Sequence, residues 1–363
     1  CKTSKEVGDL VKNTNLATTF KEIANNGIKT FYDGKIAHQI VNAVKKNDGL
    51  LSLDDLKNYQ VKKPEISCFN YRDYEICSPG PPYAGRMVLG QVLGILENFD
   101  LSLMKPYSYE FISLFSQAQK FAFKDKNLYL ADQEFVSTPY SNVYDSEYTK
   151  SLAKLIRDNN SYNNLNHLNK FFEDIFSIDK PSTTHICVID SSGNAVSMTS
   201  SIENAFGSGI VVGGFFLNNE LTDFSSKFEQ NGKVIANSIE PLKRPASSMS
   251  PTLVFNKNKE LFMILGSPGG SRIPAFVLKT IIAVIDFKMN IEEAVNFANI
   301  VLLKDVLELE ENTEVVKLKS EFEKQGYKVK IGPINSGVHI LAIKDGIISG
   351  AADPRREGVA LGD

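Results

Sequence analysis

The sequence predicts a layered α+β sandwich, and two observations carry this prediction. The first half of the chain is dominated by segments with the spacing of amphipathic helices, whereas the second half alternates pairs of short apolar strands with helices. This order is typical of sheets that bury one face against a layer of helices. A chain of 363 residues, 42% hydrophobic and 23% charged, is long enough to bury a large core in this way.

The first half is predicted to be mostly helical. Apolar side chains recur at helical spacing in several segments, and Gly or Pro residues separate these segments. A serine followed by two acids at 52–55 is typical of a helix cap. The expected elements are helices over 16–26 and 34–46, a short helix after Ser52, a strand over 71–76, and helices over 83–99 and 107–130.

The second half is predicted to be rich in hairpins. Three short polar turns, SSGN, NKNK and KDG, each lie between two apolar runs of strand length. The expected elements are strands over 186–190, 195–201, 252–255 and 260–265, helices near 272–287, 291–300 and 314–325, and strands over 338–343 and 347–350. Residues 141–182, which are rich in Asn, Ser, Asp and Lys, are expected to be an exposed linker with a fragment of helix.

The composition narrows the function classes. Forty Lys and Arg against 43 Asp and Glu give a net charge of −3, and no basic run is present, so nucleic acid is not an expected partner. No apolar run approaches the roughly 18 residues of a membrane-spanning helix, and no membrane span is expected. A small or peptide-like molecule is the expected substrate.

The four cysteines, at positions 1, 68, 77 and 187, form no C-x-x-C pair and have no zinc spacing. Since the four histidines are scattered as well, no metal and no cofactor are expected. Cys68 and Cys77 could meet across a hairpin, and the sequence leaves their pairing open.

Common catalytic motifs are absent from the sequence, which has no G-x-S-x-G elbow, no P-loop and no H-E-x-x-H. The second half instead carries short strings dense in Gly, Ser, Asn and acidic residues, which place polar groups on loops beside strands. These strings are TTH at 183–185, FGSG at 206–209, LNNELTDF at 217–224, RPASSMSP at 244–251, GSPGGSR at 266–272 and DPR at 353–355.

Two of these strings suggest a chemistry from their residue types. Gly269 and Gly270 precede a predicted helix, so their N–H groups suit a developing oxyanion better than a phosphate, because the lysine of a P-loop is missing. A tight strand-to-helix turn is the structural alternative. Asn219, Glu220 and Asp223 form an acidic patch that could bind an ammonium group or cap a turn.

In chain order, the six strings resemble the gamma-glutamyltransferases (gamma-glutamyltranspeptidases), a family of N-terminal nucleophile hydrolases. LATTFKEIANNG, FYDGKIAHQIV and NDGLLSLDDLKNY in the first half match as well, so the resemblance runs from about Leu16 to the C-terminus. It implies a fold more specific than the patterns alone, namely a four-layer αββα sandwich of the N-terminal nucleophile hydrolase type.

The resemblance implies that the chain cuts itself between Ser182 and Thr183. Residues 1–182 would then be the C-terminal part of a large subunit, and residues 183–363 a small subunit that stays bound to it as a heterodimer. An N-terminal threonine carries its own base, because its α-amine has a pKa of about 7.7–8.0, whereas an internal threonine has only an amide nitrogen. Cleavage and activation would therefore be one event.

The resemblance also implies roles for individual residues. Thr183 would be the nucleophile, and Ser201 lies where the family usually has a threonine that hydrogen-bonds it. Glu203 lies where many members have asparagine. The remaining roles are Gly269 and Gly270 in the oxyanion hole, Glu220 and Asp223 at the substrate ammonium, and Ser247 and Ser248 at its α-carboxylate, with Asn219 as a further substrate-binding residue.

The implied activity is hydrolysis or transfer of the gamma-glutamyl group of glutathione and related compounds, with water or an amine as acceptor. Within the same fold, a poly-gamma-glutamate or cephalosporin acylase type of activity is an alternative, and an inactive member that serves as a binding protein is another. Because relatives are usually exported, a periplasmic or secreted location is expected.

Three features stand apart from the family pattern. The arginine that pairs the substrate α-carboxylate is expected before residue 1, and no residue here is assigned that role. Arg86 replaces a small residue after the proline cluster, and the sequence offers no account of it. Residues 224–243 occupy the position of a lid loop but contain no tyrosine.

Overall fold

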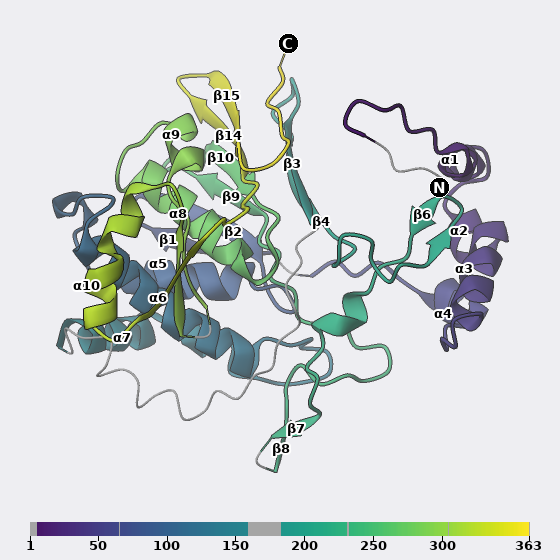
Figure 1. The fold of residues 1–363 in the computed structure, drawn as a ribbon, viewed down its shortest axis with the longest axis horizontal. Coiled ribbons are helices and arrows are strands. Elements are labelled where there is room, and N and C mark those ends of the chain that lie inside the picture. Colours follow the sequence, from purple (N-terminus) through teal and green to yellow (C-terminus); the bar gives the residue numbers. More distant parts are fainter. Residues whose placement is uncertain (1–5, 65, 159–182, 231, 304, 363) are drawn as a thin grey trace. The chain divides into compact units, whose positions relative to one another are not determined.

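The computed structural model describes residues 6–64, 66–158, 183–230, 232–303 and 305–362. The chain forms two compact units (Figure 1). One comprises Cys1–Lys63 with Asn204–Asn219, and the other comprises Pro64–Glu203 with Glu220–Asp363. Within the described ranges, no helix has both the length and the apolar character that crossing a membrane requires.

The first unit is a small helical cluster with one short hairpin. Its helices are α1 (Thr14–Asn26), α2 (Lys29–Asp33), α3 (Lys35–Lys45) and α4 (Leu53–Asn58), and its strands are β5 (Val211–Val212) and β6 (Phe215–Phe216). Ile36, Ile40 and Val212 are the buried centre. Ser52 caps α4 in a capping box with Asp55, as the sequence predicts.

The second unit is built on a six-stranded sheet in which every neighbouring pair is antiparallel. The sheet unites strands from both halves of the chain, because the β1–β2 hairpin pairs with β9. In sheet order the strands are β1 (Ile66–Tyr71), β2 (Tyr74–Pro79), β9 (Thr252–Phe255), β10 (Leu261–Gly266), β14 (His339–Lys344) and β15 (Ile347–Ala352).

Helices cover one face of this sheet and bury the main core against it (Figure 1). The α8 helix is apolar on nearly all sides, which fits its burial between the sheet and other helices. The helices of this unit are α5 (Gly90–Leu96), α6 (Tyr109–Tyr129), α7 (Ser146–Asp158), α8 (Ile273–Ile285), α9 (Ile291–Asn296) and α10 (Lys319–Lys324).

The hairpin of β3 (Thr184–Ile189) and β4 (Ala195–Ser200) packs on the opposite face of the sheet, against β10 and β14. Side chains alternate along β10, so Met263 and Leu265 join the helical core while Gly266 faces His185 of the hairpin. This hairpin gives the second unit two β layers beneath its helices.

The described residues confirm a mixed α+β fold, and they do not establish the fourth layer of the predicted sandwich. The outer face of the β3–β4 hairpin carries Ile186, Val188, Val196 and Met198, each about half exposed. These four side chains form two cross-strand pairs and make an apolar outer face.

A second, three-stranded sheet was missed by the sequence prediction. It consists of β11 (Ile300–Leu303), β12 (Val306–Glu310) and β13 (Lys328–Gly332), with β12 and β13 parallel. The apolar run from 300 to 309 resembled the continuation of the helix expected over 291–300, but α9 ends at Asn296. Asp305 has a φ of 61°, so the chain reverses there and forms a hairpin.

The strand predicted over 71–76 was wrong. Tyr71 ends β1 and Tyr74 begins β2, so the predicted segment contains the turn between them. Arg72 adopts a φ of 52°, which an extended strand does not allow. The predicted segment thus holds the last residue of β1, the turn and the first three residues of β2.

The segment predicted over 141–182 as an exposed linker with a fragment of helix contains such a helix, but this helix is packed in the core rather than exposed. Residues 146–158 form the amphipathic helix α7, which packs on α5 and α6. Its buried side chains Thr149, Leu152, Ala153 and Ile156 recur at helical spacing within a polar segment. Residues 159–182 of the predicted linker lie outside the described residues.

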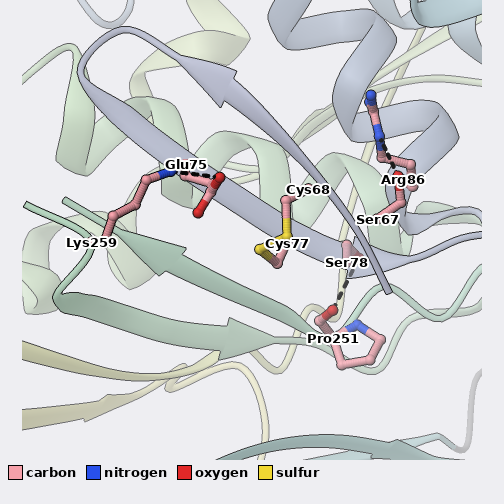
Figure 2. The surroundings of a disulfide bond; sticks show 8 residues. All are labelled: Ser67, Cys68, Glu75, Cys77, Ser78, Arg86, Pro251 and Lys259. Atoms are coloured by element: carbon pink, nitrogen blue, oxygen red, sulfur yellow. Dashed lines mark hydrogen bonds and ion pairs between the residues drawn. A yellow bond between two sulfur atoms is a disulfide. The ribbon is translucent and has the colours of Figure 1, made fainter. Parts of the chain in front are cut away.

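Arg86, for which the sequence offers no account, has a structural role in the packing of the second unit. Its guanidinium lies over the rings of Phe69 and Tyr144, at 4.6 and 3.7 Å from their centres. Its Nε donates to the Ser67 hydroxyl over 3.1 Å (Figure 2). Arg86 therefore joins the β1 strand to the helices rather than serving a cavity.

The structure settles the pairing that the sequence left open, because Cys68 and Cys77 form a disulfide across the β1–β2 hairpin (Figure 2). The same hairpin is tied to its neighbours by an ion pair between Lys259 and Glu75 at 2.7 Å. Cys187 is a free thiol.

Removing this disulfide is expected to destabilise the second unit. Replacing Cys68 and Cys77 together by alanine should lower the free energy of unfolding by about 2–3 kcal/mol, because a short loop in the unfolded chain is no longer closed. Denaturant unfolding with and without a reductant measures this effect. The reductant should destabilise the wild type and leave the double variant unchanged, and a wild type insensitive to reduction would contradict the prediction.

Candidate active site

A cavity of about 130 Å³ in the second unit collects most of the residues that the sequence singled out. Segments that are distant in the chain meet at this cavity. It is lined by Phe123, Lys126, Asn127, Leu130, Thr183, Ser201, Glu203, Glu220, Thr222, Asp223, Phe224, Ile235, Asn237, Ala246, Ser247, Ser248, Met249, Gly270, Ser271, Ile273 and Leu303.

Thr183 and Ser201 are brought together by the β3–β4 hairpin. Thr184 pairs with Ser200 at the open end of the hairpin. Thr183, just before Thr184, and Ser201, just after Ser200, therefore lie side by side. The two hydroxyls are 3.1 Å apart, and Thr183 is 8% exposed. The Ser201 oxygen accepts from the Glu203 N–H over 2.9 Å, which fixes the rotamer of Ser201 beside Thr183.

Three carboxylates gather on one side of the cavity. Glu220 and Asp223 lie on one 3-10 helix, Glu220–Asp223, and Glu203 lies near them. Burial, followed by the charges of Glu220 and Glu203, raises the pKa of Asp223 to about 7. Burial also raises the pKa of Glu220, while hydrogen bonds from Asp223 and Ser201 oppose that rise.

The acidic side therefore holds a proton near neutral pH in the absence of a cation. An ammonium group placed there would replace this proton and satisfy carboxylate lone pairs that are otherwise costly to bury.

Ser247 and Ser248 form another side of the cavity. The Ser247 backbone is held at both ends, since its N–H donates to the Pro82 carbonyl and its carbonyl accepts from the Ala84 N–H, each over 2.8 Å. Lys126 of α6 donates from Nζ to the Ser248 hydroxyl over 2.8 Å. The proline cluster at 78–82 thus serves to position this serine loop.

Asn237 connects the acidic side to the serine side. Its side-chain amide donates to the Asp223 carbonyl over 2.8 Å, and its side-chain oxygen accepts from the Ala246 N–H over 2.9 Å. The serine loop is also anchored by Arg244, which pairs with the buried Asp132 at 3.2 Å. Although burial acts to raise the pKa of Asp132, the bonds from Arg244 lower it overall.

Gly269 and Gly270 lie at the entry to α8, with φ angles of 142° and 59° that favour glycine. Gly270 lines the cavity, whereas Gly269 lines a separate pocket beside it. A side chain at Gly269 would have its Cβ 2.4 Å from the Phe276 ring, so this turn leaves no room for one. The role of both N–H groups at an oxyanion stays a prediction.

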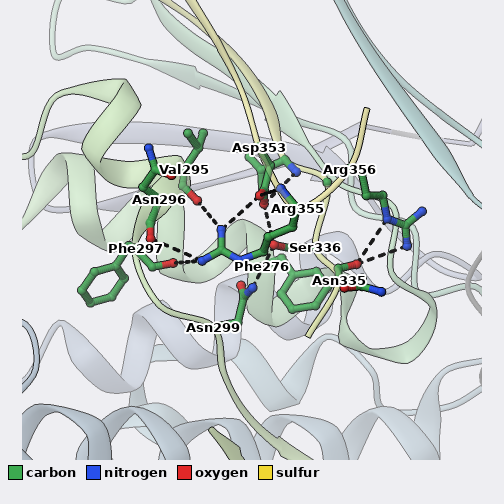
Figure 3. A network of polar contacts seen from close by, with 12 residues as sticks. Phe276, Val295, Asn296, Phe297, Asn299, Asn335, Ser336, Asp353, Arg355 and Arg356 are labelled. Carbon is green, nitrogen blue, oxygen red and sulfur yellow. Dashed lines mark hydrogen bonds and ion pairs between the residues drawn. The ribbon is translucent and has the colours of Figure 1, made fainter. Parts of the chain in front are cut away.

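The C-terminal string DPR forms the centre of a network of polar contacts (Figure 3). Asp353 binds the Ser336 hydroxyl and Arg355, and Arg355 also donates to the Val295 carbonyl over 2.9 Å. The adjacent Arg356 donates to the Thr183 carbonyl over 3.4 Å. This network orders the chain that carries Arg356 and so holds the backbone of Thr183.

His185 lies two residues after Thr183 but faces away from the cavity, into the contact between the hairpin and the sheet. Burial, with a smaller effect of His339, lowers its pKa to about 3, so it stays neutral. Its ring nitrogens contact Thr199 at 2.8 Å and Cys187 at 3.3 Å. Burial likewise raises the pKa of the Cys187 thiol to about 12. Over the described residues, no histidine lines the cavity beside Thr183.

Among the described residues, the structure brings eight of the predicted site residues to one cavity and places two elsewhere. The eight are Thr183, Ser201, Glu203, Glu220, Asp223, Ser247, Ser248 and Gly270. Asn219 belongs to the first unit, where its side chain accepts from the Asn204 N–H over 2.9 Å. Gly269 lines the neighbouring pocket, and Ser182 lies outside the described residues.

Sequence reasoning missed Lys126, Asn237 and Arg356. The signal for Lys126 was present, because the charged run Lys124–Asp125–Lys126 interrupts the apolar stripe of a buried helix. Asn237 lies in the predicted lid segment, of which Phe224 and Ile235 also line the cavity. In the described part of the chain, no three His, Cys, Asp or Glu side chains are grouped so as to hold a metal ion.

Comparisons with known proteins place this site in context. The family model described as gamma-glutamyltranspeptidase matches residues 2–363. The glutathione hydrolase proenzyme of Escherichia coli (strain K12) is 37% identical over 358 residues, which cover 96% of this chain and 61% of that protein. The glutathione hydrolase proenzyme of Bacillus subtilis (strain 168) is 33% identical over 378 residues, which cover 98% of this chain and 62% of that protein.

The crystal structure of cephalosporin acylase from Bacillus halodurans is similar in fold, with a TM-score of 0.80 at 22% identity, over 98% of this chain and 63% of that one. The chain thus spans about three fifths of the length of each of these relatives.

The acidic side of the cavity predicts a pH dependence of stability. Since the pKa of Asp223 rises from 3.8 to about 7 on folding, the folded state retains a proton that the unfolded state has released between these values. Stability contributed by this group therefore falls as the pH rises from about 4 to 7. Asp223→Asn should remove this loss and raise the melting temperature at pH 8 by about 2–4 °C relative to the wild type.

Thermal melts at pH 5 and pH 8 check this expectation. Asp345→Asn, which removes a carboxylate from the exposed β14–β15 turn, is the matched control and should leave the difference between the two pH values unchanged. If Asp223→Asn proves less stable than the wild type at pH 8, the repulsion inferred for the acidic side is wrong.

Proposed function

The chain belongs to the gamma-glutamyltranspeptidase family, and from this premise we propose that the protein is an autoprocessing gamma-glutamyl hydrolase or transferase. One observation carries the proposal: the hydroxyl of the buried Thr183 lies 3.1 Å from that of Ser201, in a cavity that it shares with half-buried carboxylates and a serine pair. The substrate class is that of glutathione and related gamma-glutamyl amides.

The first step of the proposed function is cleavage of the chain before Thr183. The Thr183 Oγ attacks the Ser182 carbonyl carbon, and the peptide C–N bond breaks as the nitrogen gains a proton. This leaves an ester between the two residues and a free α-amine on Thr183. Water then hydrolyses the ester, so that residue 182 ends in a carboxylate and residue 183 begins a new chain.

Cleavage supplies a base on the nucleophilic residue itself. A threonine hydroxyl is a weak nucleophile and needs an adjacent proton acceptor, and the neutral His185 faces the sheet instead. The freed α-amine, with a pKa of about 7.7–8.0, is partly unprotonated at neutral pH and lies on the same residue as the nucleophile. Ser201 orients the hydroxyl beside it.

Catalysis then proceeds through an acyl-enzyme. Thr183 attacks the gamma-amide carbonyl of the donor, and the N–H groups of Gly269 and Gly270 stabilise the oxyanion. The leaving amine takes the proton from the α-amine. Water or an acceptor amine attacks the ester next and carries away the glutamyl group.

The polar sides of the cavity support a glutamyl donor over a plain acyl donor. Glu220 and Asp223, with Glu203 beside them, form a site for the α-ammonium, while Ser247 and Ser248 are proposed to bind the α-carboxylate. The acyl group of a cephalosporin side chain that lacks an ammonium would bring no positive charge to these acids. The cost of burying their negative charges, which raises their pKa values, would then remain. A gamma-linked glutamate polymer presents the same α-carbon groups and is the alternative substrate.

The proposal extends to the assembly, the fourth layer of the fold and the location. The two fragments would remain a heterodimer, because β1 and β2 from the first half pair within one sheet with strands of the second half. The apolar outer face of the β3–β4 hairpin supports a further layer that covers it. The Cys68–Cys77 disulfide supports a periplasmic or secreted location, since disulfides persist in oxidising compartments.

Substitution of Thr183 tests the proposal. Thr183→Ala in the full-length protein should leave a single uncut chain and lower turnover of a gamma-glutamyl anilide at least about a thousandfold, because nucleophile and base are both lost. Intact-mass measurement and N-terminal sequencing should find a wild-type fragment that begins at Thr183.

The neighbouring Thr184 provides a matched control, since it has the same side chain but is exposed on β3. Thr184→Ala should be cut and should retain activity. A wild-type protein that stays whole, or a Thr183→Ala variant that is cut at the same bond, would contradict the proposed mechanism.

A further inference from the structure

Lys126 is a charged residue of the cavity to which no role has been given so far. It lies near the end of α6 (Tyr109–Tyr129), a helix whose other side chains are mostly buried in the core. Its Nζ donates to the Ser248 hydroxyl over 2.8 Å, and its side chain lines the cavity that contains Thr183. The helix thus places a positive charge beside Ser248.

The neighbouring acid on α6 points elsewhere. Asp125 is 5% exposed and accepts from the Gln91 amide over 2.7 Å and from the Tyr148 hydroxyl over 3.0 Å. Consecutive residues of a helix differ in direction by about 100°, so Lys126 faces the cavity while Asp125 faces the core between α5 and α7. Both Lys126 and Asp223 line the cavity, and the charge of Lys126 acts to lower the pKa of Asp223, which burial and the neighbouring acids raise.

The cavity is therefore polarised. Glu203, Glu220 and Asp223 make one side acidic, and Lys126 with Ser248 makes the other side basic and rich in donors. An α-amino acid group carries an ammonium and a carboxylate on the same carbon, so it presents both charges within one small volume. A ligand with this group compensates both sides at once, whereas a ligand with only one charge leaves the opposite side uncompensated.

We propose that Lys126 is a specificity-determining residue that recognises the α-carboxylate of the donor, acting together with the Ser248 hydroxyl to which it donates. This inference rests on the proposed gamma-glutamyl activity and names the residue that selects an α-amino acid over a simple amine. An ammonium has three donors, so Nζ keeps its bond to Ser248 while a second N–H binds a carboxylate oxygen.

The alternative role for Lys126 is that of a structural counter-charge to the acidic side. The two roles differ in what they discriminate. A counter-charge supports every ligand that places an ammonium among the acids, whether or not that ligand has a carboxylate. A carboxylate-binding residue supports only ligands that carry the carboxylate.

Three anilides separate these roles when they are assayed with the full-length protein. The gamma-glutamyl anilide carries both charges, 4-aminobutanoyl anilide lacks the carboxylate, and glutaryl anilide lacks the ammonium. Lys126→Met should raise KM for the gamma-glutamyl and glutaryl compounds about tenfold to a hundredfold, the size expected for a lost charge-assisted hydrogen bond. KM for the 4-aminobutanoyl compound and kcat for all three should change less than about threefold.

Two further variants complete the test. Lys124→Met removes a lysine that does not line the cavity and should leave all three KM values unchanged. Lys126→Arg retains the charge and should recover part of the loss. Equal effects of Lys126→Met on all three anilides, or no effect on any, would overturn the inference in favour of a counter-charge or of no role.

Equilibrium binding keeps this result separate from the proposed function. Calorimetric titration of L-glutamate and 4-aminobutanoate into the wild type and Lys126→Met requires no turnover. If the wild type cleaves no anilide but binds L-glutamate in a Lys126-dependent way, the activity is wrong and the inference stands. If the wild type turns over and Lys126→Met binds L-glutamate equally well, the inference fails alone, and binding of neither compound by the wild type overturns both.

Discussion

The site depends on the packing of the β3–β4 hairpin against the six-stranded sheet. The His185 ring lies directly against Gly266 of β10, where a Cβ atom would come within 2.2 Å of the ring. Ser197 adds a hydrogen bond to the Leu265 carbonyl over 3.0 Å. Because these contacts fix the hairpin, Thr183, just before its first strand, and Ser201, just after its second, meet at one end of it.

The electrostatics of the cavity follow from that placement. The hairpin end lies at a cavity that is also lined by three half-buried carboxylates and by a serine loop, in which residues 82–84 hold the Ser247 backbone. Asn237 ties the two sides together through its hydrogen bonds to the Asp223 carbonyl and the Ala246 N–H. Burial and mutual repulsion raise the pKa of Asp223, so ionising all three acids costs free energy when no cation is near them. A cationic ligand would reduce this free-energy cost.

The sequence predicted most regular elements well, and two of its errors share a physical cause. Helices such as α3 and hairpins such as β3–β4 were found because their apolar spacing and turn residues agree locally. The β1–β2 turn and the β11–β13 sheet were missed, since both depend on single residues, Arg72 and Asp305, that adopt a left-handed φ. No periodicity announces such a residue when it is neither glycine nor asparagine.

The sequence by itself determined the class of chemistry, because Thr183, Ser201, the acids and the serine pair are fixed residue types in a fixed order. It did not determine which of them share a cavity. Asn219 lies next to Glu220 in the chain yet belongs to the other unit, whereas Lys126 comes from a helix more than fifty residues before Thr183. Only the tertiary structure decided this, because the direction of a side chain depends on long-range packing that local patterns do not encode.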